Sequence, residues 1–240
     1  MVAFGDVMID GLGPIREFPS VSAMSGLLAN AVGFRREGTD RLSRLQERLV
    51  VAYRMDHVHS RFTDFQTAQL NGADRAWTTS GAIQERAGGA NTFNSPHIRW
   101  RDYDSDASIT AVLRLNDDVE PPTLDDLSRA LQWPSRPLFL GRKCCLPSAP
   151  LFAGFAEAND AFQALRKVPL HEQVCSRARL ANGRREGIVV TLPPEEPCPD
   201  GFELVTSTER RDWPAGVHAG VQRRYRGNVP YDTFATSKPT

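Results

Sequence analysis

The chain has 240 residues, of which 40% are hydrophobic, enough for one large domain or two small ones that share a core. No apolar run approaches the ~20 residues that a membrane span needs, and the amino terminus, MVAFGDVMID, lacks the basic region that opens a signal peptide. We therefore expect a soluble, cytoplasmic protein. The formal net charge is +0, with 29 basic and 29 acidic residues, which argues against a globally basic nucleic-acid binder.

Nearly all of the positive charge is arginine, because Lys143, Lys167 and Lys238 are the only lysines. Arginine presents a planar fork of donors that suits phosphate groups and stacking on bases. A GC-rich genome produces the same bias with no function behind it, so composition alone leaves both explanations open.

The first predicted element is a helix over residues 20–32. Ser20 or Ser22 can cap its amino terminus, apolar residues recur along it at helical spacing, and Gly33 is a natural stop.

A second amphipathic helix is predicted from about Asp40. Its inward residues are Leu42, Leu45 and Leu49, and its outward residues are Arg41, Arg44 and Arg48. The three arginines would form one basic face, for which a solvated surface is favoured over a binding surface.

Strand patterns follow at residues 49–53, 61–70 and 109–115, the last alternating as a half-buried strand does. Between the second and the third, residues 71–96 are rich in Gly, Ala, Asn, Thr and Ser and show no periodicity. A stretch of this length without a core pattern is typical of a functional loop or of disorder.

The remaining elements are a helix over 123–131 with Thr123 and Asp126 as a capping box, a helix over 160–167, a strand at 188–192 and a hairpin-like region over 202–231. This order predicts an α+β fold of ferredoxin-like type with an insertion between two strands. We divide the chain into a first domain over residues 1–150 and a smaller β-rich part over 151–240.

The chain lacks a recognisable catalytic or metal-binding motif. The four cysteines, Cys144, Cys145, Cys175 and Cys198, contain no C-x-x-C pair, so we expect them to pack as small hydrophobic residues. His57 and His59 would need a third ligand, and only Asp56 and Asp64 lie near them in the sequence. We therefore predict no catalytic residue, no metal and no cofactor.

Arginines alternate with aromatic residues in the run IRWRDYD. In an extended chain Arg99, Arg101 and Tyr103 share one side, with Trp100 and Asp102 on the other. Such a side can bind unpaired nucleotides, with guanidinium groups on phosphates and a ring beneath a base. The alternative is an ordinary strand edge with a charged rim.

The corner Gly141-Arg142-Lys143 also has two interpretations. The glycine permits a turn whose amides approach an anion, with two cations beside it. Paired basic residues beside a glycine turn are, however, common on protein surfaces.

Several segments together resemble the CasD family, a subunit of the type I-E CRISPR Cascade surveillance complex. They are REFPSVSAMSGLLANAVGF, DFQTAQL, WRDYDSDASITAVLRL and RPLFLGRKCCLPSAPLF, in the family's order and with family-like spacing up to about Phe152. Near the carboxyl end, RRYRGNVPY is similar to the family's basic tail strand.

The resemblance implies a modified RNA-recognition-type domain with a long inserted thumb at about residues 71–98. It implies a non-catalytic subunit that caps the 5′ end of the CRISPR RNA (crRNA) and holds its repeat-derived handle. The partners would be the crRNA, the Cascade backbone and large subunits and, through the complex, target DNA, with no membrane involved.

With this resemblance, the patterns give seven expected RNA contacts. A helix start near Ser22 would direct its amides at a phosphate, and the two arginine motifs would lie on the RNA side. The full set is Arg16, Ser22, Arg99, Arg101, Tyr103, Arg142 and Lys143.

The chain departs from the family pattern at its start. Family members begin with a strand that precedes a segment similar to MVAFGD, so we expect the first strand of the sheet to be missing here. A mis-assigned start codon is the preferred explanation, and a replacement by another segment is the alternative.

Two other functions are weighed against the RNA-capping role. A metal-independent endoribonuclease would need a base near the 2′-hydroxyl and a cation, for which Tyr53, His57, His59 and Lys143 are candidates. A generic single-strand binder that acts alone is disfavoured by the neutral net charge.

Overall fold

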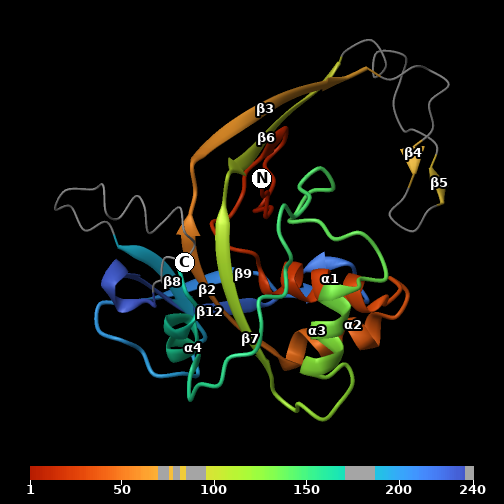
Figure 1. Cartoon of the computed structure of the whole chain (residues 1–240). Coiled ribbons are helices and arrows are strands. Elements are labelled where there is room, and N and C mark those ends of the chain that lie inside the picture. The colour runs from red at the N-terminus through yellow and green to blue at the C-terminus, as the bar shows by residue number, and fades with distance from the viewer. Residues whose placement is uncertain (70–75, 78–81, 85–95, 171–186, 236–240) are drawn as a thin grey trace.

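The computed structural model describes residues 1–69, 76–77, 82–84, 96–170 and 187–235. Its central sheet has five strands in the order β7-β2-β8-β12-β9 (Figure 1). The strands are β7 (Ser108–Leu115), β2 (Leu49–His57), β8 (Ile188–Leu192), β12 (Val221–Val229) and β9 (Glu203–Thr208). β2 pairs with β7 on one side and with β8 on the other. Strands from residues 1–150 and from 151–240 therefore form one sheet, in the mixed α+β class that the sequence predicts.

Helices cover both faces of this sheet. Side chains of α1 (Val21–Val32), α2 (Thr39–Arg48) and α3 (Leu124–Gln132) share one hydrophobic cluster with Val51 and Tyr53 of β2. On the opposite face, α4 (Ala161–Lys167) contributes to a second cluster that contains Ala52. Because successive strand residues point to opposite faces, β2 is buried on both sides.

The predicted helix ends are confirmed. The Ser20 hydroxyl accepts a hydrogen bond of 3.1 Å from the Ala23 amide at the start of α1, and Gly33 ends the helix with φ 94°. Thr123 and Asp126 form the capping box of α3. In each case a local donor or acceptor pattern decides the boundary, so the sequence is sufficient to place it.

A second sheet stands out from the body of the protein. It consists of β1 (Leu12–Gly13), β6 (His97–Ser105) and β3 (Ser60–Ala68) in that order, and β3 and β6 form a long antiparallel hairpin (Figure 1). Beyond the hairpin, β4 (Ala76–Trp77) pairs with β5 (Ile83–Gln84). Most of the predicted insertion lies outside the described residues, and its role as a thumb stays a prediction.

The hairpin-like region predicted near the carboxyl end is present. β9 and β12 pair antiparallel, and the short hairpin of β10 (Arg211–Asp212) and β11 (Val217–His218) lies between them in the chain. A 3₁₀ turn, η2 (Tyr231–Thr233), follows β12.

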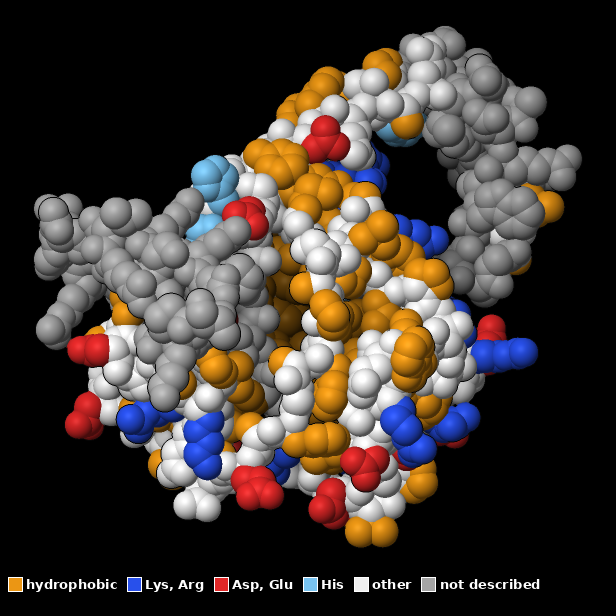
Figure 2. Space-filling view, in the orientation of Figure 1, with side chains coloured by type: hydrophobic (Ala, Val, Ile, Leu, Met, Phe, Trp, Pro, Cys, Tyr) orange, Lys and Arg blue, Asp and Glu red, His pale blue; other side chains and the backbone are white. Residues whose placement is uncertain are grey.

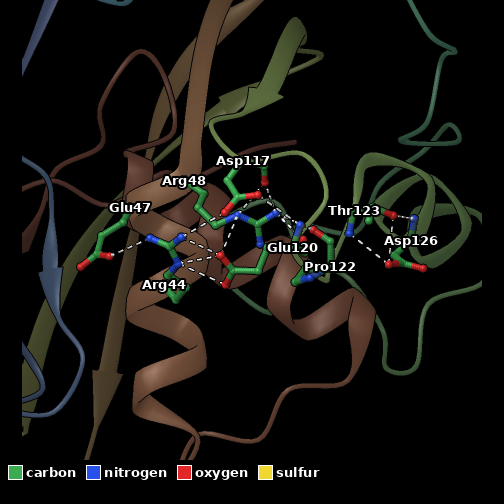
Figure 3. A network of polar contacts seen from close by, with 8 residues as sticks. All are labelled: Arg44, Glu47, Arg48, Asp117, Glu120, Pro122, Thr123 and Asp126. Atoms are coloured by element: carbon green, nitrogen blue, oxygen red, sulfur yellow. Dashed lines mark hydrogen bonds and ion pairs between the residues drawn. The ribbon is translucent and has the colours of Figure 1, made fainter.

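The prediction that three arginines form one basic face on α2 is wrong. Arg41 and Arg44 are exposed, but Arg48 is only 2% exposed and donates hydrogen bonds to backbone carbonyls of the β7–α3 loop (Figure 3). The acceptors are the carbonyl oxygens of Asp117, Glu120 and Pro122. Arg44 pairs with the carboxylate of Glu120 at 2.6 Å. The loop that covers this side of α2 comes from about 70 residues further along the chain, so helical periodicity does not reveal it.

Two fold expectations remain predictions. β7 and β9 are the edge strands of the central sheet as far as the chain is described, and this order does not decide whether a first strand is missing. The ferredoxin-like topology is likewise not established. No helix in the described segments is both long and apolar enough to cross a membrane.

Candidate nucleic-acid interface

The β3–β6 hairpin places three basic side chains on one face. His97, Arg99 and Arg101 alternate along β6, and the pairing register sets Ala68, Gln66 and Asp64 opposite them on the same face. The predicted shared side of Arg99 and Arg101 is thereby confirmed. We call His97, Arg99 and Arg101 the basic face of the hairpin.

The basic face borders a hollow of about 530 Å³. Its lining residues are Gln66, Thr67, Ala68, His97, Arg99 and Arg101. Figure 2 shows Lys and Arg side chains on the underside of the projecting hairpin. The sequence did not suggest Gln66 or His97 as site residues; strand alternation extended to both strands of the hairpin would have found them.

The two arginines of the basic face are free to bind a ligand. Among the described residues, the exposed side chain of Arg101 makes neither a hydrogen bond nor an ion pair, and the side chain of Arg99 donates only to the carbonyl of its neighbour Ile98, at 2.8 Å. Asp64 lies opposite Arg101 in the register but receives its hydrogen bond from Gln66, at 2.5 Å. Most donors of the two guanidinium groups are therefore unoccupied in the described part of the chain, and a guanidinium with open donors has the geometry to bind an anionic oxygen.

Tyr103, expected beside these arginines as a stacking platform, is buried. Its side chain is 4% exposed, its ring stacks on that of Phe62 at 5.4 Å between centroids, and the Arg142 guanidinium lies 4.8 Å from the ring centre. Both covering groups come from distant parts of the chain, so alternation along β6 alone could not predict the burial. Tyr103 packs the base of the hairpin and offers no open ring face to a base.

Arg142, also expected to face RNA, binds the protein backbone. It donates to the carbonyl of Asp102 at 2.8 Å and to that of Gly13 at 2.9 Å, and so joins β6 to β1. Gly141 turns with φ 97°, where a side chain would collide with the backbone of Ala3. Lys143, in contrast to Arg142, is exposed, so its ammonium group lies in solvent.

The two cysteines of the corner behave differently. Cys145 is buried beside Ala3 and Ile15, as expected, whereas Cys144 is exposed, contrary to the expectation that both pack inward. In the described part of the chain, histidine, cysteine and carboxylate side chains form no group able to hold a metal ion. Cys175 lies outside the described residues.

Arg16 and Ser22 do not line the hollow. Arg16 forms ion pairs with Asp6 at 2.8 Å and with Glu209 at 3.3 Å. Ser22 is 5% exposed, and its hydroxyl lies 3.0 Å from that of Ser20, whose oxygen already caps α1. These contacts give both residues structural partners within the chain.

Two of the four candidates for a nuclease site are buried. Tyr53 is fully buried against Phe18, and burial raises the pKa of its hydroxyl to about 12. His57 is buried, with Asp106 at 3.5 Å, while His59 and Lys143 are exposed. A buried phenol with so high a pKa stays protonated at neutral pH and cannot reach a ribose hydroxyl.

Comparisons with known proteins agree with this architecture. Residues 1–225 match the family described as CRISPR-associated protein (Cas_Cas5). The chain is 30% identical over 167 residues to the "CRISPR system Cascade subunit CasD" of Escherichia coli (strain K12), an alignment that covers 69% of this chain and 71% of the relative.

Two solved structures share the fold. One, titled "CRISPR RNA-guided surveillance complex", contains a chain that is 21% identical, with a TM-score of 0.64 over 98% of this chain and 89% of that one. The other, "Crystal structure of Cas protein", is 23% identical, with a TM-score of 0.54 over 99% and 94% of the two chains. The match to the family over most of the chain is decisive: this protein belongs to the CRISPR-associated Cas5 family, and the resemblance to CasD seen in its sequence is confirmed.

Proposed function

We propose that the chain is a non-catalytic, RNA-binding subunit of a cytoplasmic type I-E Cascade. In this role it caps the 5′ handle of the crRNA, contacts the backbone and large subunits, and meets target DNA only through the assembled complex. The membership of the Cas5 family and the similarity to a Cascade subunit support this assignment.

The observation that carries the RNA site is the basic face beside its hollow. Arg99 and Arg101 project from one side of a projecting hairpin and have no competing carboxylate bound to them in the described residues. Unpaired arginines that alternate along an extended strand suit the phosphates of a short single strand better than those of a duplex.

The non-catalytic part of the proposal is supported by the burial of Tyr53. Metal-independent cleavage needs a base close to the 2′-hydroxyl and a cation at the developing charge. The one candidate phenol lies in the hydrophobic core, and its pKa of about 12 keeps it neutral.

The RNA site is tested by replacing both arginines of the basic face. Complexes purified with Arg99→Ala/Arg101→Ala should retain crRNA ~5–150-fold more weakly, the effect of losing roughly 1–3 kcal/mol of charge-assisted contacts. The matched control is Arg35→Ala/Arg36→Ala, which removes two positive charges at exposed positions of the α1–α2 loop, outside the hairpin. Equal RNA content in the wild type and the double variant would contradict the proposed site.

The absence of catalysis is tested separately. The purified chain is incubated with end-labelled repeat RNA in EDTA, and the products are separated on a denaturing gel. We expect intact RNA. Cuts at one position in the repeat that persist in EDTA would overturn the non-catalytic assignment and favour the endoribonuclease.

A further inference from the structure

The face of the hairpin opposite the basic face carries a row of exposed apolar side chains. Phe65 of β3 lies opposite Trp100 of β6, and Trp100 lies opposite Leu12 of β1. Leu12 in turn exchanges backbone hydrogen bonds of 2.8 and 3.2 Å with Ile9 in the preceding turn. Because directly paired residues share a face, these four side chains form one line across the sheet, which we call the apolar strip (Ile9, Leu12, Phe65 and Trp100).

All four side chains of the apolar strip are open to solvent. Their exposures are 62% for Ile9, 51% for Leu12, 56% for Phe65 and 40% for Trp100. Figure 2 shows hydrophobic side chains along the projecting hairpin. Single exposed hydrophobic residues are ordinary on protein surfaces, but a contiguous group with two aromatic rings marks an interaction surface.

The strip is held in a fixed geometry. The rings of Phe65 and Trp100 contact each other with centroids 5.6 Å apart, and the Trp100 ring lies against Gly11, where a side chain would meet the indole at 3.5 Å. Below the strip, Arg61 and Asp104 join β3 to β6 through two hydrogen bonds of 2.8 and 3.0 Å. A preorganised aromatic pair loses little conformational entropy when a partner covers it.

The charges beside the strip decide which kind of molecule can cover it. On this face of β3 and β6 the charged side chains are Arg61, Asp102 and Asp104, and the arginine is engaged by Asp104. Asp10, exposed in the turn between Ile9 and Leu12, adds a further carboxylate. The charges of Arg61 and Asp104 cancel each other, which leaves Asp102 and Asp10 without a basic partner among the described residues of this face. The rim therefore carries a net negative charge, which disfavours RNA phosphates and favours basic groups.

We propose that the apolar strip is a docking surface for another protein, specifically an apolar patch bordered by basic residues on a neighbouring subunit of the complex. The inference rests on the proposed function for the identity of the assembly, but it concerns the other face of the hairpin. RNA is thus bound on one face of β3–β6 and protein on the other. Aromatic anchors are the residues on which protein interfaces most often depend.

The apolar strip is large enough to form the centre of a protein interface but not the whole of it. Each aromatic side chain can bury roughly 150–250 Å², so four large apolar residues supply on the order of several hundred Å². A stable interface needs ~800 Å² per partner. The partner must therefore also cover neighbouring surface, such as the exposed Val7 and Met8 of the same amino-terminal segment.

The test separates protein docking from RNA binding. Phe65→Ser/Trp100→Ser is compared with Leu204→Ser, a control that removes an equally exposed leucine (52%) from β9. Each variant is co-expressed with the other Cascade subunits and crRNA, and incorporation is measured by native mass spectrometry. Handle-RNA affinity of each isolated chain is measured by filter binding. We expect incorporation of the double variant to fall at least ~10-fold, with RNA affinity unchanged and the control unaffected.

A conservative variant guards against a folding artefact. Phe65→Leu/Trp100→Phe keeps the surface apolar and should restore incorporation. Because Trp100 is only 40% and Phe65 56% exposed, the thermal melt of the serine variant is recorded beside it, and the conservative variant should melt closer to the wild type.

The other outcomes are distinguishable. Normal incorporation of the serine variant overturns the docking surface, whether or not its RNA affinity is reduced. The proposed function is left standing by either result. If the wild type itself neither binds handle RNA nor joins the complex, the proposed function fails. In that case the docking surface is tested by the accessibility of Trp100. Iodide quenching of tryptophan fluorescence is measured for the wild type and for Trp100→Phe, before and after the other subunits are added. If the quenching that Trp100 contributes does not change on their addition, the docking surface is overturned as well.

Discussion

Replacing the buried arginine of the central strand should destabilise the whole protein. Arg54 of β2 is fully buried. Its guanidinium donates to both carboxylate oxygens of Asp56 and to the Thr110 hydroxyl at 3.2 Å. It also donates to three backbone carbonyls at the carboxyl end of α4, those of Leu165 at 2.6 Å, Val168 at 2.8 Å and Pro169 at 3.1 Å. One side chain thus fastens α4 to the sheet.

The cost of Arg54→Met follows from what is left behind. The carboxylate of Asp56 keeps the hydroxyl of Thr110 at 2.7 Å but loses its counter-ion in a site where it is only 6% exposed. The carbonyls at the end of α4 also lose their donor. Breaking a buried ion pair from one side costs ~3–5 kcal/mol, a large part of a total stability of ~5–15 kcal/mol. For a chain of this size the melting temperature should fall by on the order of 10 °C.

The assay is denaturant unfolding followed by both tryptophan fluorescence and far-UV circular dichroism. The control is Arg226→Met, which removes an arginine of β12 whose side chain is 46% exposed and pairs with Glu17 at 3.0 Å. That exposed pair is worth at most ~1 kcal/mol. Arg54→Met/Asp56→Leu should recover part of the loss, because no charge is then left buried alone. An Arg54→Met protein within ~1 kcal/mol of the wild type would refute the reasoning.

Two further predictions concern buried groups. Among the described residues the hydroxyl of Tyr53 has no hydrogen-bond partner, so Tyr53→Phe should leave stability unchanged or raise it by ~1 kcal/mol at neutral pH. Burial raises the pKa of this hydroxyl to about 12, whereas an unfolded tyrosine has ~10. The group does not change stability with pH below pH ~10, and the wild type loses up to roughly 3 kcal/mol as the pH rises from ~10 towards 12, because the unfolded phenol ionises first. Urea midpoints between pH 8 and 11 should therefore fall less for Tyr53→Phe, and parallel curves would contradict the prediction. For the cysteines, Cys145→Ser should lower the free energy of unfolding by ~1–3 kcal/mol because a hydroxyl enters a buried site, and Cys144→Ser should change it little. Both variants should keep RNA binding. Stoichiometric zinc in the wild type that disappears in either variant would overturn this view.

The fold was predictable wherever the deciding interactions are local. The cap at Ser20, the stop at Gly33 and the capping box at Thr123 depend on residues within four positions, and their sequence patterns predicted them correctly. The alternation that puts Arg99 and Arg101 on one face is also a local property of a strand, and the pairing register confirms it.

The errors arose where distant segments meet. Arg48 follows the helical period of an exposed residue, but the β7–α3 loop folds over it. Tyr103 alternates with the exposed arginines and is nevertheless covered by Phe62 and Arg142. Arg142 resembles a phosphate ligand in the sequence, yet backbone carbonyls of Gly13 and Asp102 occupy its donors. No spacing rule within one segment encodes such contacts, because each needs the folded arrangement of two or three segments.

The central claim, that the basic face holds the 5′ handle, is tested most directly by locating the RNA. A crRNA carrying 4-thiouridine in its handle is assembled into the complex and irradiated, and the cross-linked peptides are identified by mass spectrometry. The account predicts cross-links in the β6 peptide that contains Arg99 and Arg101, and their loss when the photoreactive base is moved to the 3′ end. Handle cross-links confined to other subunits, or to the apolar strip on the opposite face, would contradict it.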